Sequence, residues 1–457
     1  MYCILADRLS AADYLLSIEN INLNLADKAG RTALHVAAHK SNLEILKLIY
    51  VKNKECSLNL KPYLQDKDGL TALHLVTRGQ KIECLSFILK NFIKREQIDQ
   101  GDVHDRTALS YAACVGSANG VRLLLEMGAN AGIPDIEGQT PLHWAVRNID
   151  SRETVRLILE SVPSLLNWQD HEGRTPLHIA VCLGNGSVVE ELLKGVEIPK
   201  KKNSPSLKRS KSNSVLRKTS MKLLKRTNTS KINELPNNSE DQKTEINSSK
   251  IYPDPSIPDN AFRTVLHCAA QIGNPEICEN LLNFCSNSNN SIPINISDSY
   301  GATCLHYAAL NDHFQTLNIF LNNAKLDALK FVNHVDVDNR SALHWAVTKG
   351  SVEVISCLLS AGGDSKLADC QGNTPLHLAC GLASGNSVYP EAVEVLTDFS
   401  VDAMFLSNQD SLTPLHIAAE RGHMSIVKVL LENDVKNMEN GQESIFEGGK
   451  QYLNIDF

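Results

Sequence analysis

GRTPLHIAV, residues 173–181, is the stretch that decides the fold, because variants of it recur along the chain in ten copies. Each copy has a Thr or Ser, a Leu two residues later, usually a His at the fourth position, and Ala or Val at the sixth. The copies start at Thr32, Thr71, Thr107, Thr140, Thr175, Thr264, Thr303, Ser341, Thr374 and Thr413. The fourth position holds His35, His74, His143, His178, His267, His306, His344, His377 and His416, with Ser110 in the third copy. Such repetition predicts a stack of similar helical units, each of which buries its apolar side against its neighbours.

Each motif is followed by the remainder of a helical hairpin. In the last copy, Pro414 suits the first position of a short helix, and Gly422 then interrupts the chain. Apolar residues at helical spacing predict a second helix that includes 426–431. Asp170 and Gly173, before the fifth motif, suit the tight turn of a hairpin finger. The T-P-L-H-x-A opening resembles that of the ankyrin family. This resemblance implies an all-α ankyrin-repeat solenoid of helix-turn-helix units with β-hairpin fingers, about ten full repeats long.

The spacing of the motifs predicts the domain organisation. Successive motifs start 33 to 39 residues apart, except that 89 residues separate Thr175 from Thr264. Because helices that pack on both neighbours tolerate no insertion, the extra residues must form a segment between the fifth and sixth repeats. We therefore expect a partial repeat over 1–26, repeats 1–5 over 27–195, an insertion over 196–260, repeats 6–10 over 261–436 and a polar tail over 437–457.

The predicted insertion differs in composition from the rest of the chain. Residues 200–231 contain twelve Lys or Arg and no acidic residue, whereas the whole chain carries a net charge of −7. With so few apolar groups to offset the entropy of ordering, this segment is expected to be disordered. Ser212 and Ser220 each follow an Arg by three residues, which makes them candidate phosphorylation sites for a basophilic kinase. Chance matches in a Ser-rich basic tract explain them equally well.

Val215 to Arg226, within the insertion, combine apolar residues with five basic ones. This stretch is a candidate basic helix for an anionic membrane or for calmodulin. A solvated run of charge is the alternative. No aromatic residues interleave with the basic ones, so nucleic-acid binding is not expected.

The remaining composition argues against secretion and against catalysis. Twelve cysteines are scattered without a C-x-x-C pair, and no stretch is long and apolar enough for a signal peptide or a membrane span, so a reducing, cytoplasmic location is expected. No nucleotide-binding or catalytic motif is present, and we expect neither enzyme activity nor a cofactor. The ladder of motif histidines is not expected to bind metal. Equivalent positions in stacked repeats lie roughly 10 Å apart, whereas zinc needs ligand nitrogens within about 2.1 Å.

Protein partners are expected in a groove lined by finger tips and first helices, as in other repeat stacks. Candidate contacts are finger residues that the repeat motif does not require: Asp135, Ile136, Glu137, Trp168, Gln169, His171 and Glu172. Trp168 is the best single anchor if its ring is exposed, because Trp is enriched among interface hot spots. Packing of that ring against the neighbouring finger is the alternative.

Several stretches match beyond the repeat consensus and resemble the inversin family. They are MYCILADRLSAADYLL at the N-terminus, NAGIPDIEGQTPLHWAV, SLLNWQDHEGRTPLHIAV and SDSYGATCLHYAA. The resemblance implies a non-enzymatic adaptor in ciliary and Wnt signalling, with Dishevelled and nephrocystin partners, at the cilium or centrosome. The family's IQ motifs are absent here, and the basic insertion departs from its pattern. Two other functions stay open: a membrane- or phosphoinositide-associated scaffold regulated through the insertion, and a regulatory or substrate-receptor subunit of an enzyme.

Overall fold

The computed structural model describes residues 1–18, 21–55, 58–197, 250–287, 294–324, 328–381 and 390–439. Ser212, Ser220, the stretch from Val215 to Arg226 and most of the predicted tail lie outside these residues. The chain divides into two compact units, one comprising Met1–Val196 with Tyr252–Phe457 and the other Glu197–Ile251. The larger unit carries all ten motifs.

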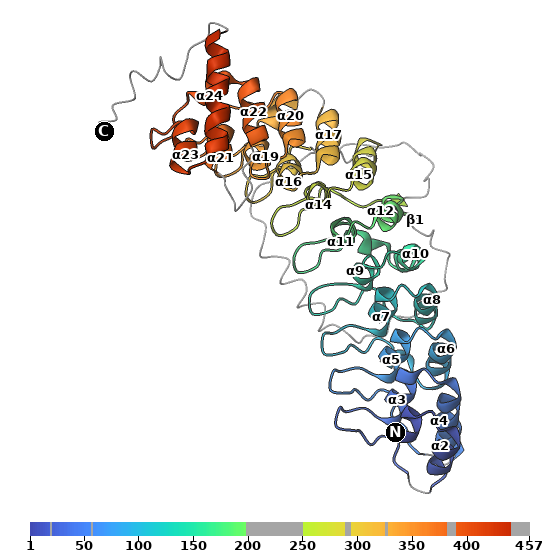
Figure 1. Ribbon diagram of the computed structural model, residues 1–457. Helices are drawn as coiled ribbons and strands as arrows, with labels where there is room; N and C mark the ends of the chain where they lie inside the picture. The colour runs from blue at the N-terminus through green and yellow to red at the C-terminus, as the bar shows by residue number, and fades with distance from the viewer. Residues whose placement is uncertain are drawn as a thin grey trace, which may run out of the picture. The chain divides into compact units, whose positions relative to one another are not determined.

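Each motif opens a helical hairpin, so the described chain contains a first and a second helix for every repeat (Figure 1). The first helices are α3 (Ala33–Lys40), α5 (Ala72–Arg78), α7 (Ala108–Cys114), α9 (Pro141–Ala145), α11 (Pro176–Cys182), α14 (Val265–Ile272), α16 (Cys304–Leu310), α19 (Ala342–Val347), α21 (Pro375–Gly381) and α23 (Pro414–Glu420). The second helices are α4 (Leu43–Glu55), α6 (Ile82–Asn91), α8 (Ala118–Glu126), α10 (Arg152–Ser161), α12 (Gly186–Leu193), α15 (Pro275–Asn287), α17 (Phe314–Asn323), α20 (Val352–Ser360), α22 (Pro390–Phe399) and α24 (Met424–Glu439). Short elements join them: η1 (Arg95–Gln97), η2 (Pro163–Asn167), α18 (Ala328–Val332) and η4 (Val401–Met404).

The core forms where these helices stack. Each first helix contacts the first helix of the next repeat, and second helices contact second helices in the same way. The motif leucine points into this stack and is buried, as for Leu142 and Leu177. Burial of a Leu side chain contributes about 1.5–3 kcal/mol, so the motif supplies much of the stacking energy. Ala145 and Ala180, at the sixth motif position, are fully buried and small enough to let neighbouring helices approach. The predicted all-α repeat stack is confirmed.

The fingers are joined by a ladder of backbone hydrogen bonds. In every repeat after the first, the N–H four residues before the motif Thr or Ser donates to a carbonyl of the preceding finger, as from Ile136 to His104 at 3.0 Å. The nine bonds are Lys67→Ala29, Val103→Asp68, Ile136→His104, His171→Glu137, Asn260→Glu172, Ser299→Ala261, Val337→Tyr300, Cys370→Asp338 and Gln409→Gln371. The register of all ten fingers is therefore fixed by main-chain atoms.

Repeats 5 and 6 stack directly on each other although 89 residues separate their motifs. The Asn260 N–H donates to the Glu172 carbonyl at 2.9 Å, and α11 contacts α14. The Gln169 side-chain amide also donates to the Pro258 carbonyl at 3.0 Å. The predicted insertion boundaries of 196–260 are therefore wrong at the C-terminal side, because residues from Tyr252 onward belong to the repeat unit. Two short strands, β1 (Val196–Glu197) and β2 (Lys250–Ile251), pair with each other.

The first and last described helices extend the array at its two ends. Helices α1 (Tyr2–Leu5) and α2 (Leu9–Leu16) contact α3 and α4 in the same way as a full repeat contacts its neighbour. At the other end, α24 continues to Glu439. The predicted start of the tail at residue 437 is thus too early. Among the described helices, none combines the length and apolarity that crossing a membrane requires.

Candidate interaction surface

The motif histidines occupy a structural position within each repeat. In repeat 4, the Thr140 backbone N–H donates to His143 Nδ1 at 3.1 Å, and Thr140 Oγ1 lies 2.9 Å from the same nitrogen. The pair forms a capping box in which His takes the place of the usual Glu or Gln. Since Nδ1 accepts, the proton is on Nε2, which donates to the Arg174 carbonyl of the next repeat at 3.2 Å. One side chain therefore caps its own helix and binds the neighbouring finger.

The same bridge recurs along the stack. The imidazole Nε2 atoms of His35, His74, His178, His267, His306, His344 and His377 each contact a backbone carbonyl of the following repeat at 3.0–3.2 Å. Burial lowers the pKa of each of these histidines, and lowers the pKa of His143 and His306 to about 4. Ser110 caps its helix with Thr107 but is too short to reach the next repeat. Both nitrogens of the bridging rings are thus already used by protein groups.

A carboxylate, or in repeat 10 an amide, five residues before the motif organises each finger. In repeat 4, Asp135 Oδ1 accepts the backbone N–H groups of Glu137 and Gln139 at 3.0 and 2.8 Å. Its Oδ2 accepts the indole N–H of Trp144 at 2.9 Å. Asp135 is only 7% exposed, and the turn and the first helix both need it, so the expectation that the fold does not require this residue is wrong.

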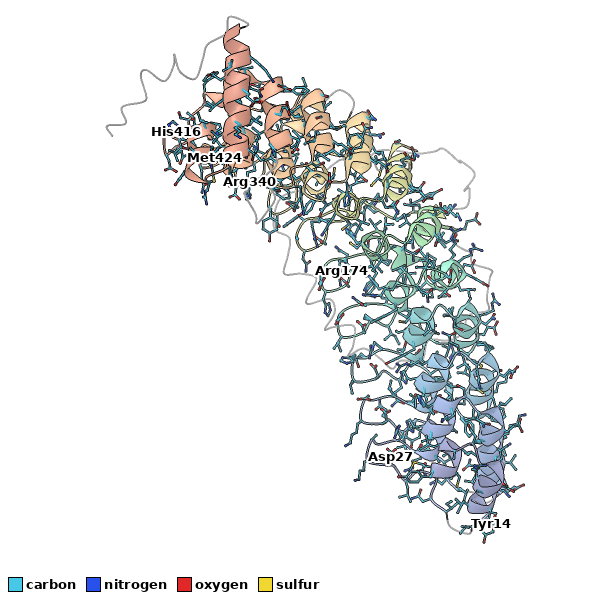
Figure 2. All side chains as sticks on the ribbon, viewed as in Figure 1. Tyr14, Asp27, Arg174, Arg340, His416 and Met424 are labelled. Atoms are coloured by element: carbon cyan, nitrogen blue, oxygen red, sulfur yellow. The ribbon has the colours of Figure 1, made fainter. Side chains whose placement is uncertain are left out.

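Equivalent residues hold the other fingers in the same way. Asp27, Asp66, Asp102, Asp170, Asp259, Asp298, Asp336, Asp369 and Asn408 accept the corresponding pair of N–H groups at 2.8–3.0 Å. Where Arg precedes the motif, its guanidinium pairs with the same carboxylate: Arg31, Arg106, Arg174, Arg263 and Arg340 do so. Figure 2 shows Asp27, Arg174 and Arg340 among the finger loops. These arginines and carboxylates therefore form ion pairs with each other inside their own repeats.

Four repeats carry an aromatic residue at the fifth motif position, on the first helix beside the fingers. Each donates to the finger carboxylate of its own repeat: Tyr111 to Asp102, Trp144 to Asp135, Tyr307 to Asp298 and Trp345 to Asp336, at 2.6–2.9 Å. The polar edge of each ring is thereby fixed while the ring stays half-buried. Held rings of this kind provide contact area with little loss of conformational entropy on binding.

We define the finger face of repeats 3 and 4 by Arg106, Ile136, Trp144 and Arg147, which bring an aromatic ring, an exposed apolar side chain and two guanidinium groups together. Two guanidinium groups lie near the Trp144 ring, with the Arg147 and Arg106 carbons 4.6 and 5.8 Å from a ring centroid. A cavity of about 140 Å³ opens beside it, lined by Arg106, Ile136 and Trp144 together with His104, Asp135 and Glu137. Ile136 is 50% exposed on the finger tip.

Some of the other predicted finger contacts have exposed side chains, and some form hydrogen bonds that hold the fingers together. Trp168 is 40% exposed, and its indole N–H donates to the Gly138 carbonyl of the preceding finger at 3.2 Å. Gln169 uses its side-chain amide within and between fingers. His171 is exposed, and Glu172 is exposed and pairs with Arg174 at 2.7 Å. Ile136, Glu137 and His171 are therefore the predicted contacts whose exposed side chains form no hydrogen bond or ion pair with other described residues.

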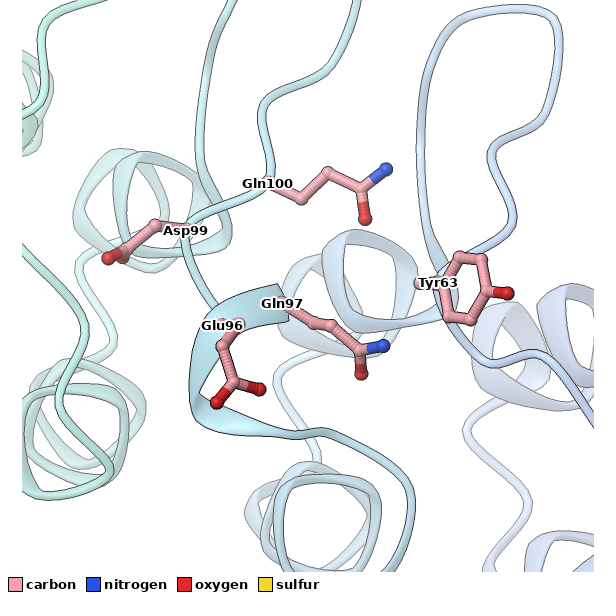
Figure 3. A pocket seen from close by; sticks show the side chains of 5 residues that line it. All are labelled: Tyr63, Glu96, Gln97, Asp99 and Gln100. Atoms are coloured by element: carbon pink, nitrogen blue, oxygen red, sulfur yellow. The ribbon is translucent and has the colours of Figure 1, made fainter. Parts of the chain in front are cut away.

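A larger, open pocket lies on the loops of repeats 2 and 3. Its volume is about 380 Å³, and Tyr63, Glu96, Gln97, Asp99 and Gln100 line it. Figure 3 shows that Gln97 and Gln100 extend toward Tyr63, whereas Asp99 points the opposite way. The two carboxylates do not converge on one point, so this pocket offers no acid–base pair.

A thiol pair lies at the junction of repeats 5 and 6. Cys182 on α11 is exposed and Cys268 on α14 is buried. A hydrogen bond from Cys268 lowers the pKa of the Cys182 thiol, helped by the charges of Arg263 and Arg174, and the same bond raises the pKa of Cys268. Cys182 is thus the more reactive thiol of the two.

Comparison with known proteins agrees with this architecture. Family profiles described as ankyrin repeats match residues 15–76, 56–135, 127–202, 246–330, 322–398 and 381–448. The chain belongs to the ankyrin-repeat family. Among individual ankyrin proteins, human inversin is 41% identical over 197 residues, which are 42% of this chain and 18% of inversin. Zebrafish inversin is 45% identical over 196 residues, with the same shares.

A more distant ankyrin relative is the chicken nuclear factor NF-kappa-B p105 subunit, 30% identical over 179 residues, or 38% of this chain and 17% of that protein. The predicted resemblance to the inversin ankyrin region is confirmed. The match spans less than a fifth of the inversins' own length.

Proposed function

We propose that this protein is a non-enzymatic scaffold that binds partner proteins through the finger face of repeats 3 and 4. The observation that carries the proposal is the half-buried Trp144 ring, which donates a hydrogen bond to Asp135 and lies near two arginines and the exposed Ile136. Trp and Arg are the residues most enriched among interface hot spots. Membership of the ankyrin family and identity to inversin support a role in protein interaction.

The similarity to inversin also motivates a cellular setting. We place the scaffold in the cytoplasm and at the cilium or centrosome, in Wnt signalling through Dishevelled, by analogy with that family. The basic insertion is the alternative functional element, as a phosphorylation-regulated contact with membranes or phosphoinositides. The experiment below separates the two.

Affinity capture from ciliated-cell lysate tests the scaffold proposal. Four baits are compared: the intact chain, Ile136→Asp, Val51→Asp and a chain lacking residues 198–249. Val51 is a matched control, because it is 44% exposed on the second helix α4, away from the fingers. Partners lost with Ile136→Asp but kept with Val51→Asp support binding through the finger face. Partners that the Ile136→Asp bait still captures but the deletion bait does not would show that the insertion, rather than the finger face, binds them.

A further inference from the structure

Arg147 differs from the finger arginines because no acidic residue of the described chain pairs with it. Its Nη1 donates to the carbonyl of His143, one turn earlier on the chain, at 2.9 Å, and its guanidinium stacks on Trp144. Among the described residues it forms no ion pair, whereas Arg106 and Arg174 each bind a finger carboxylate at 2.8–2.9 Å. Five N–H donors on a guanidinium leave capacity for an additional acceptor.

The surroundings of Arg147 disfavour an unpaired cation. Burial lowers the pKa of Arg147, and the positive charge of Arg174 lowers it further. Two acidic groups, Asp170 and Glu137, offset only part of the cost of burying the Arg147 charge. Asp170 is already bound by Arg174 and Gln139, and Glu137 lies exposed on the finger tip. A partly desolvated cation gains most from a carboxylate supplied by a ligand, since the cost of removing its water has been met in the free protein.

The eighth motif position, which Arg147 occupies, carries an Arg in repeats 2 and 4 and no Lys or Arg in the other repeats. The eighth motif position is His39, Arg78, Cys114 and Arg147 in repeats 1–4, but Gln271, Leu310 and Thr348 in repeats 6–8. The finger face of repeats 3 and 4 therefore combines the exposed Ile136 side chain, the Trp144 ring and the guanidinium group of Arg147, which forms no ion pair with other described residues. Charge complementarity selects a partner segment that carries carboxylates next to an apolar side chain.

We propose that this face binds an acidic peptide segment of a partner protein, with a carboxylate on Arg147 and a neighbouring apolar side chain against Trp144 and Ile136. The inference rests on the proposed scaffold function and names the chemical class of its partner. Arg supplies two parallel N–H donors to a carboxylate, so the contact is directional as well as electrostatic.

Fluorescence anisotropy with defined probes tests this inference. The probes are a fluorescein-labelled peptide of alternating Glu or Asp and Leu, and its counterpart with Gln and Asn in place of the acids. The proteins are the full chain, Arg147→Gln, Ile136→Asp and Arg152→Gln. Arg152 is a matched control, since it lies exposed on the second helix of the same repeat. We expect the acidic probe to bind at least tenfold more tightly than the amide probe, and Arg147→Gln to remove that preference while Arg152→Gln keeps it.

Ile136→Asp places a like charge beside the site and is expected to weaken the acidic probe more than the amide probe. This second variant keeps the test decisive if Arg147→Gln fails to fold, which circular dichroism would reveal. Equal binding of the two probes, or an unchanged preference in the folded Arg147→Gln or Ile136→Asp protein, overturns the inference. If captured partners still depend on Ile136 in that case, the scaffold function stands and only the acidic class is wrong.

Discussion

Acid should destabilise the repeat stack through its buried histidines. His143 and His306 are fully buried as neutral rings, each capping a helix and donating to the next repeat. Their pKa falls from an ordinary 6.5 to about 4 in the folded chain because burial disfavours the charged ring. A folded-state pKa below the unfolded value means that the unfolded chain binds protons first as the pH falls. The stabilisation is therefore complete above pH 6.5 and is lost between pH 6.5 and 4.

The size of the effect follows from proton linkage. With those pKa values, each of the two rings loses about 2 kcal/mol of stabilisation between neutral pH and pH 5, or about 4 kcal/mol for the pair. That amount is a large fraction of the 5–15 kcal/mol that typically separates folded and unfolded states. The other bridging histidines act in the same direction.

Urea unfolding at pH 7.5 and pH 5.0, followed by circular dichroism, measures this loss. His143→Ser copies the Thr107–Ser110 arrangement of repeat 3. The variant should be less stable at pH 7.5 by about 1–3 kcal/mol, because the Arg174 carbonyl loses its donor. It should also lose about 2 kcal/mol less than the unmodified chain on moving to pH 5.0. His104→Ser, on an exposed finger tip, is the control and should change stability by less than about 0.5 kcal/mol at either pH. An identical acid-induced loss in His143→Ser and the unmodified chain would refute the reasoning.

Three further predictions concern other parts of the stack. Gly138→Ala should lower stability more than Gly422→Ala in urea unfolding. Both glycines have a positive φ, +77° and +73°, which costs about 1–2 kcal/mol for Ala. Only at Gly138 would the new Cβ also meet a neighbouring atom, His171 Cδ2, at 2.7 Å. Equal losses would contradict the clash. Iodoacetamide at pH 7.5 should alkylate Cys182 faster than Cys268, as read by mass spectrometry of peptides, because the pKa of Cys182 is lowered. Equal rates would argue against the thiol pair. Replacing residues 198–249 with a short Gly-Ser linker should shift the thermal midpoint by less than about 3 °C in calorimetry, since loop length changes closure entropy slowly. A larger drop would show that the segment supports the junction.

The repeat architecture is predictable because one short motif contains the residues for several structural features: the helix cap, the core and the close contact between helices. Thr140 and His143 cap the helix, Leu142 fills the core and Ala145 allows close approach. These requirements are local or involve the adjacent copy, so they recur in the sequence at a regular interval. The limits of the insertion were less accurate, because Tyr252 joins the repeat unit through contacts that no motif marks.

The binding face was harder to predict. Asp135 was interpreted as a free finger residue, yet an acidic or amide residue recurs five positions before every motif, and this regularity was the available signal of a structural role. Trp144 and Arg147 occupy motif positions that vary between repeats, so a consensus says nothing about them. Their significance depends on which finger carboxylates are already paired, which only the three-dimensional arrangement of Arg106, Asp135 and Arg174 reveals.

Site-specific photocrosslinking in cells tests the central claim most directly. A photoreactive amino acid is placed at Ile136, on the finger face of repeats 3 and 4, and in a parallel chain at Val51, on the second helix α4. Partner proteins are expected to crosslink from position 136 and not from position 51. Crosslinks from position 51 alone would contradict it, and would move the interaction surface of this ankyrin stack to its second helices.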